Sequence, residues 1–255
     1  MPRIVYGIHP VLELLRSRRE IALVVVTEEG GRGTLRELVE RARRQDVAVE
    51  VKPRAEVDAL ARGGHHQGVV AITGEYVYAD VEDILSFAEK RGEAALIVAL
   101  DGVQDPQNLG AIVRSAHVLG AHGVLVPMHR AVSVTSSVVR VSAGATEHMH
   151  IARVTNLVRT LEDLKERGLW VVGTVAEGGR APWEVDQTSP TVLVLGAEGK
   201  GLRPLVLRVC DERVRIPMAG QVSSLNVAAA ASITLYEVLR QRLMAQKQKE
   251  QQRTS

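Results

Sequence analysis

From residue 94 onward, short apolar runs alternate with amphipathic stretches, and this alternation constrains the fold of the 255-residue chain more than any other feature. Runs rich in valine, isoleucine and leucine, such as residues 96–100, are typical of strands buried on both faces. The stretch that follows has helical periodicity, with Leu109, Ile112 and Val113 on one face. Strands that alternate with helices predict an α/β fold with a largely parallel sheet covered on both faces.

The same patterns divide the chain into segments. Residues 1–73 predict a small α/β domain, residues 74–93 an acidic linker with a helix at 81–90, and residues 94–246 a larger α/β domain. The polar end, residues 247–255, predicts a disordered tail. In the first domain we expect helices at 10–16, 34–45 and 56–61 and strands at 22–27, 47–51 and 68–72. In the second we expect strands at 96–100, 124–126, 149–154, 170–174, 192–195 and 213–216 and helices at 109–119, 136–143, 157–167, 202–209 and 225–245.

Bulk composition excludes several classes of protein. No apolar stretch approaches the roughly 20 residues that span a bilayer, and the N-terminus lacks the basic-then-apolar pattern of a signal peptide. The single cysteine, Cys210, cannot form an internal disulfide. These features predict a soluble cytoplasmic protein. The net charge of +2 is only weak evidence for a nucleic-acid partner.

The first strand–helix junction carries Asn108 and Arg114. Asn108 suits a loop that turns into a helix, where asparagine caps the free N–H groups. On a single helix the two side chains would point about 120° apart, so they converge on one ligand only if Asn108 lies in the loop. Arg114 falls at the edge of the apolar stripe and needs an anionic partner, which is either a carboxylate or an RNA phosphate.

Two later junctions are also rich in polar and small residues. Residues 196–201 place three glycines around Glu198, which indicates either a plain tight turn or a close backbone approach to a ligand. No GxGxxG or phosphate-loop pattern is present, so neither a dinucleotide site nor an NTPase is indicated. In the third junction, Ser224 and Asn226 precede an alanine-rich helix and suit capping of its first N–H groups.

Together the three junctions, residues 108–115, 195–202 and 216–228, resemble the three motifs of the SpoU family of RNA ribose 2′-O-methyltransferases, within the SPOUT superfamily. The N-terminal stretches around Tyr6 and His66 are similar to the RNA-binding module of the rRNA-methylating branch, a module like a ribosomal protein. The resemblance implies a deep trefoil knot in the C-terminal domain, which periodicity alone would never suggest. It also implies a homodimer.

The family resemblance further implies S-adenosyl-L-methionine as cofactor, no metal, and catalytic roles for Asn108, Arg114, Glu198, Ser224 and Asn226. Arg114 would come from the other subunit or the dimer seam and activate the ribose hydroxyl, although arginine side chains stay protonated in proteins. The residues implied in cofactor binding are Thr174, Val175, Ala176, Gly196, Ile216, Ser224 and Leu225.

Ala197 and the run from Ile216 to Gly220 look most like the enzyme that methylates a guanosine ribose in the peptidyl-transferase loop of 23S rRNA. The implied partner is 23S rRNA or the assembling large ribosomal subunit, with no membrane. Two alternatives stay open at this point: the same chemistry on a tRNA guanosine or an rRNA adenosine, and a non-catalytic rRNA-binding assembly factor. The intact set of polar residues favours an enzyme.

Overall fold

The computed structural model describes residues 2–17, 19–28, 33–129, 131–221 and 224–254. The chain divides into two compact units. The first comprises Met1–Val77 and Ser133–His148, and the second comprises Tyr78–Val132 and Met149–Ser255. The division differs from the expected one in two ways: residues 133–148 group with the first unit, and the helix of the expected linker groups with the second.

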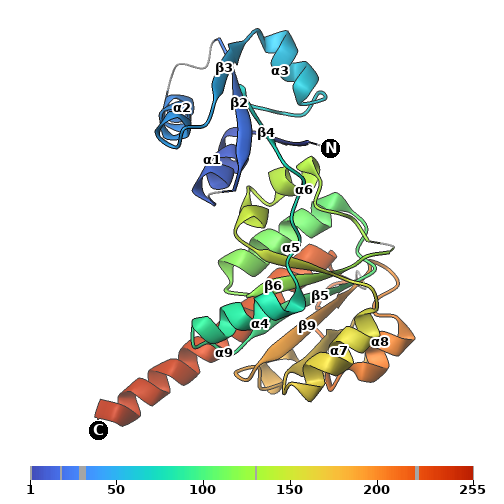
Figure 1. Ribbon diagram of the computed structural model, residues 1–255. Coiled ribbons are helices and arrows are strands. Elements are labelled where there is room, and N and C mark those ends of the chain that lie inside the picture. The colour runs from blue at the N-terminus through green and yellow to red at the C-terminus, as the bar shows by residue number, and fades with distance from the viewer. Residues whose placement is uncertain (1, 18, 29–32, 130, 222–223, 255) are drawn as a thin grey trace. The chain divides into compact units, whose positions relative to one another are not determined.

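The first unit is built on a four-stranded mixed sheet with the order β1-β4-β2-β3 (Figure 1). Strand β2 runs parallel to β3, and β4 runs antiparallel to both β1 and β2. Strand β1 was not predicted, because four residues are too short to show a clear alternation. The elements are β1 (Arg3–Tyr6), α1 (Ile8–Arg16), β2 (Ile21–Thr27), α2 (Thr34–Arg44), β3 (Val49–Lys52), α3 (Arg54–Leu60), β4 (Val69–Thr73), α6 (Ser136–Val141) and the 3-10 helix η1 (Ala145–Glu147).

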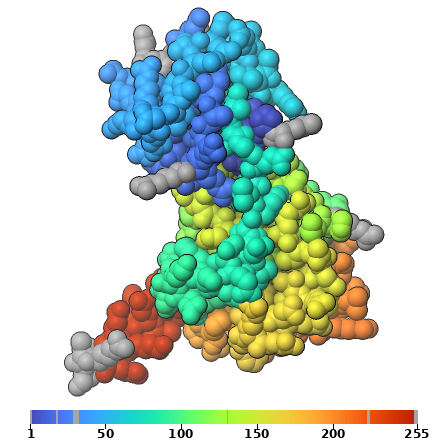
Figure 2. Space-filling view, in the orientation of Figure 1, coloured from blue at the N-terminus to red at the C-terminus, as the bar shows by residue number. Residues whose placement is uncertain are grey.

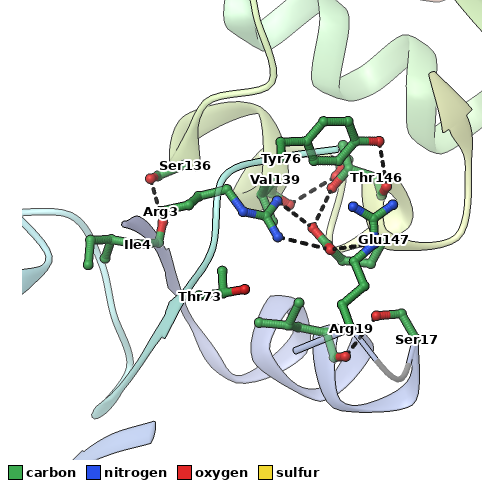
Figure 3. Close-up of polar contacts among 12 residues, drawn as sticks. Arg3, Ile4, Ser17, Arg19, Thr73, Tyr76, Ser136, Val139, Thr146 and Glu147 are labelled. Atoms are coloured by element: carbon green, nitrogen blue, oxygen red, sulfur yellow. Dashed lines mark hydrogen bonds and ion pairs between the residues drawn. The ribbon is translucent and has the colours of Figure 1, made fainter. Parts of the chain in front are cut away.

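A buried ionic cluster ties η1 to the start of the first unit (Figure 3). Glu147 has a fully buried carboxylate, and both guanidinium Nη atoms of Arg3 donate to it, at 2.9 and 3.1 Å. Arg19 approaches the same carboxylate at 3.6 Å. Both arginines lie against the ring of Tyr76, and burial raises the pKa of its phenol to about 12. Charge pairing across this sequence separation explains why residues 133–148 group with the first unit.

The second unit contains a six-stranded sheet with the order β10-β8-β9-β5-β6-β7, in which every recorded pair is parallel. The predicted parallel sheet is therefore confirmed. The elements are α4 (Val81–Lys90), β5 (Leu96–Asp101), α5 (Pro106–Val118), β6 (Gly123–Pro127), β7 (His150–Val154), α7 (Leu157–Glu166), β8 (Trp170–Thr174), the 3-10 helix η2 (Pro182–Glu184), β9 (Thr191–Gly196), α8 (Pro204–Val209), β10 (Glu212–Val214) and α9 (Val227–Thr254).

Helices cover both faces of this sheet. Alternate strand residues such as Ile97 and Val192 share one core cluster with buried residues of α4, α7 and α8. Helices α5 and α9 pack against each other, and the hydroxyl groups of Ser115 and Ser232 lie 2.8 Å apart. Chain connections leave β5 and β9 in opposite directions along the sheet, since β6 follows on one side and β10 on the other. Such a switch point opens a crevice at the carboxyl ends of the strands.

Helix α9 continues through Thr254, where we expected a disordered tail from residue 247. The physical reason is composition: residues 243–253 are mostly glutamine, lysine, glutamate, leucine, methionine and alanine, without glycine or proline. These residue types have high intrinsic helix propensity, so polarity alone was the wrong signal. Among the described residues, no helix combines the length and the apolar character that a membrane span needs.

The buried ring of His122 predicts a pH-dependent stability. Its Nδ1 accepts a hydrogen bond from the Leu96 N–H at 2.9 Å, so the ring is neutral and its Nε2–H faces Glu93 at 3.0 Å. Burial lowers the pKa of His122 below its ordinary value of 6.5, despite the neighbouring carboxylate. The unfolded chain therefore binds this proton more readily, and the stabilisation present at higher pH is lost as pH falls below about 6.5.

Urea unfolding of the wild type and of His122→Gln at about pH 7.5 and about pH 5.5 checks this prediction. The difference in unfolding free energy between the two proteins should be smaller at the lower pH. An equal difference at both pH values would show that His122 does not titrate with folding.

Candidate functional site

The loops after β5 and β9 meet at the switch point of the second unit. Asp101, the last residue of β5, has a fully buried carboxylate that accepts from the backbone N–H of Arg203 at 2.8 Å and from its Nε at 2.6 Å. A Cβ atom at Gly196 would lie 2.2 Å from the carbonyl carbon of Gly201, so only glycine fits at the end of β9. The loop after β9 is thereby held closely against the carboxyl ends of the strands.

Three residues from the three junctions converge in one hydrogen-bonded cluster. The Nδ2 of Asn226 donates to Asn108 Oδ1 at 2.8 Å and to Glu198 Oε1 at 2.5 Å. The Oδ1 of Asn226 accepts from the N–H groups of Ala228 and Ala229, and so caps the first turn of α9. Both ends of the Asn226 amide are therefore used, which fixes its orientation. We call Asn108, Glu198 and Asn226 the junction cluster.

Two cavities flank the junction cluster. The smaller, of about 260 Å³, is lined by all the residues that the resemblance implied in cofactor binding, from Thr174 to Leu225. The larger, of about 700 Å³, lies over the carboxyl ends of β5, β6, β7 and β9 and includes Asn108 in its wall. Glu198 lines both cavities, together with Ala197, Gly201 and Val227. A group held in one cavity is thus adjacent to a group held in the other.

The lining of the smaller cavity fits an S-adenosylmethionine molecule. The backbone of residues 174–176 and of Gly196 borders it, and Ile216, Met218 and Leu225 supply apolar surface. Met218 and Leu225 are 38% and 40% exposed, so their apolar surface is accessible to a ligand in the cavity. Glu198 adds a carboxylate to the wall of this cavity. The hydroxyl of Thr174 donates a hydrogen bond to the Val194 carbonyl at 3.0 Å, which fixes the orientation of this side chain.

Arg114 stands apart from the junction cluster. Asn108 lies inside α5 and not in the preceding loop, so the two side chains of that helix point about 120° apart. Arg114 is exposed, and no hydrogen bond or ion pair joins it to another residue in the described part of the chain. Within a single chain, Asn108 and Glu198 contact Asn226 and not Arg114.

Sequence reasoning missed the pairing of Asp101 with Arg203 and the larger cavity. Asp101 directly follows a buried apolar run, and an acidic residue at the carboxyl end of a parallel strand was the available signal. Its partner lies 102 positions away, so the pair itself was not visible. Among the described residues, no group of three or more histidine, cysteine or acidic side chains is arranged to hold a metal.

Comparison with known proteins agrees with this geometry. The SpoU rRNA Methylase family profile matches residues 95–236, and the profile for RNA 2′-O ribose methyltransferase substrate binding matches residues 4–79. A Bacillus subtilis protein whose name places it in the TrmH family of tRNA/rRNA methyltransferases is 43% identical over 238 residues, 93% of this chain and 95% of its own. An uncharacterized tRNA/rRNA methyltransferase of Mycobacterium avium is 45% identical over 239 residues, 93% of this chain and 77% of its own.

Solved structures of methyltransferases also superpose closely on this chain. The SpoU methyltransferase AviRb from Streptomyces viridochromogenes, in complex with AdoMet, superposes with a TM-score of 0.79 at 30% identity, over 94% of this chain and 90% of that one. The AdoMet-bound rRNA methyltransferase from Sinorhizobium meliloti gives a TM-score of 0.77 at 28% identity, over 94% and 87%. The cofactor is thus S-adenosylmethionine. The chain belongs to the SpoU methylase family of RNA ribose 2′-O-methyltransferases.

Proposed function

We propose that the protein methylates the ribose 2′-hydroxyl of one guanosine in the peptidyl-transferase loop of 23S rRNA, either as free rRNA or in the assembling large subunit. The observation that carries the proposal is the junction cluster, which joins all three motifs between two cavities that share a wall. Ala197 in the second motif and the sequence of the third motif support the 23S rRNA branch. We also propose that it acts in the cytoplasm.

The proposed chemistry is mainly positioning. When bound, the cofactor supplies a methyl group that its sulfonium already activates, so the chain has to align the ribose hydroxyl and deal with its proton. Glu198 and Asn108 border the larger cavity and are held by Asn226. We assign them to the ribose, and Ser224, Ile216 and the loop around Gly196 to the cofactor. Ser224 lines the cofactor cavity rather than the larger one.

We propose that Arg114 completes the site of a second copy in a homodimer. Arg114 and Val118 lie one turn apart on the outer side of α5, and Val118 is 71% exposed. On the adjoining helix α9, Tyr236 and Ile233 are 58% and 43% exposed. Exposed apolar side chains on two packed helices favour an interface between copies. Because arginine stays protonated, its role is to bind a phosphate and stabilise the developing oxyanion, not to remove the proton.

The trefoil knot stays a prediction. It rests on the resemblance of residues 108–115, 195–202 and 216–228 to the three family motifs.

The test uses S-adenosylmethionine with a labelled methyl group and offers the enzyme 23S rRNA and bulk tRNA in parallel. We expect label in 23S rRNA at a single guanosine. Label in tRNA alone would mean that the protein is a methyltransferase but that 23S rRNA is not its substrate. The names of the relatives include tRNA as well as rRNA. Absence of both transfer and cofactor binding by calorimetry would favour the assembly-factor alternative, whereas cofactor binding without transfer to either free RNA would point to the assembling large subunit as the substrate.

A further inference from the structure

The larger cavity has an apolar floor on which a flat ring can stack. Val103, Pro127 and Leu157 are buried beneath it, and Val158 and Leu205 add further apolar surface. Leu205 is 60% exposed at the start of α8, while its neighbour Val206 is fully buried. A volume of about 700 Å³ falls within the range of small-molecule binding sites. Because this cavity shares Glu198 with the cofactor cavity, its occupant lies next to the methyl donor.

Enzymes that act on a base take the nucleotide out of its stack and read the edge of the base, and a cavity of this kind beside the ribose site could receive a base in the same way. The three carboxylates in the cavity wall differ in whether their oxygen atoms are free to accept hydrogen bonds from a base. Asp101 is paired with Arg203, and Glu198 accepts from Asn226. Asp105, in contrast, uses only Oδ1, which accepts from the Gln107 N–H at 2.9 Å. No described residue donates to its second oxygen.

Asp105 is well placed to read a base. It precedes α5 as the N-cap residue, three positions before Asn108, and both line the larger cavity. A carboxylate oxygen accepts hydrogen bonds and donates none. Guanine presents two adjacent donors on its Watson–Crick edge, N1–H and the N2 amino group. Adenine presents an acceptor, N1, beside its single amino group, and an acceptor facing the carboxylate is unfavourable.

We propose that the larger cavity receives the base of the target nucleotide and that Asp105 selects guanine by accepting from its N1–H and N2–H groups. This inference rests on the proposed function, because it assumes that the ribose lies at the junction cluster. Lys200, also in the cavity wall and without a carboxylate partner among the described residues, would contact a flanking phosphate. Asp105 is thus a specificity determinant that lies outside the three motifs, residues 108–115, 195–202 and 216–228.

The decisive variant is Asp105→Asn, because the asparagine side chain keeps the capping oxygen and nearly the same shape. Transcripts of the methylated region carry guanosine, inosine or adenosine at the target position. With the wild type we expect the rate of methyl transfer to fall about tenfold for inosine, which lacks the N2 amino group, and about a hundredfold for adenosine. With Asp105→Asn the preference for guanosine over adenosine should shrink about tenfold or more, while cofactor affinity and melting temperature stay unchanged.

The matched control is Asp186→Asn. Asp186 makes the same local contact, accepting from the Thr188 N–H at 2.9 Å, and does not line either cavity. The Asp186→Asn variant should therefore keep the preference of the wild type for guanosine over adenosine. An unchanged preference in Asp105→Asn, or a loss of cofactor binding or of thermal stability with it, would overturn the inference.

Equilibrium binding of the same transcripts, in the presence of S-adenosylhomocysteine, separates this inference from the proposed function. If the wild type binds RNA but transfers no methyl group, the proposed function fails. The binding preference of wild type and variant for guanosine over adenosine then still decides the role of Asp105: a preference that disappears in Asp105→Asn supports it, and one that persists contradicts it.

Discussion

Replacing Arg114 by alanine is expected to reduce methyl transfer by about 10²- to 10³-fold, the usual cost of removing one group that stabilises a developing oxyanion. Affinity for S-adenosylmethionine should stay near that of the wild type, because Arg114 does not line the cofactor cavity. The measurements are single-turnover transfer to RNA and calorimetric titration of the cofactor. Arg208→Ala is the control, since Arg208 is an exposed arginine of the same unit that lines neither cavity.

A mixing experiment tests whether Arg114 acts on the site of a second copy. Arg114→Ala and Glu198→Gln should each be inactive alone. In a heterodimer, one site combines the intact Glu198 of one chain with the intact Arg114 of the other. After random exchange of subunits, an equimolar mixture should therefore recover about a quarter of wild-type activity. No recovery, in a mixture shown to exchange, would mean that Arg114 serves its own chain.

Replacing Glu147 by alanine is expected to destabilise the first unit by about 3–5 kcal/mol. The substitution leaves the guanidinium of Arg3, whose side chain is 8% exposed, buried without its carboxylate partner. Arg19 and Tyr76 would also lose the neighbouring negative charge of Glu147, because both lie in the cluster around it (Figure 3). An unpaired buried charge costs far more than the loss of a surface ion pair.

Glu40→Ala is the matched control for Glu147→Ala. Glu40 pairs with Arg36 at 3.0 Å on the surface of α2, with both side chains largely exposed. Removing such a pair should cost about 0.5 kcal/mol or less. Urea unfolding measured by circular dichroism compares the two variants with the wild type. Equal destabilisation by both would contradict the assignment of Glu147 as the central charge of the first unit.

The elements of the second unit were predictable because their signal is local. Strands β5, β6 and β9 are runs of mainly apolar residues, and the face formed by Leu109, Ile112 and Val113 is fully buried in α5. In the space-filling view, the C-terminal part of α9 projects from the rest of the second unit (Figure 2). That extension was missed, because a polar helix without an apolar face looks like a disordered segment unless its helix propensity is weighed.

Long-range pairing was beyond the reach of local patterns. Nothing in residues 133–148 indicates that they belong with the first unit, because the decisive contact joins Glu147 to Arg3, 144 positions away. The junction cluster was predictable in part. Each of its residues was singled out by its place between a strand and a helix, and the family resemblance grouped them. Their hydrogen bonds, which show Asn226 at the centre and Arg114 outside, required the structure.

The position of the transferred methyl group tests the central claim most directly. RNA labelled by the enzyme would be hydrolysed in alkali, which needs a free 2′-hydroxyl, and the products separated by size. We predict that the label appears in alkali-resistant dinucleotides, because a 2′-O-methyl group blocks cleavage at that ribose. Label in mononucleotides would mean that the methyl group is on a base, and would contradict the assignment of the ribose hydroxyl to the junction cluster.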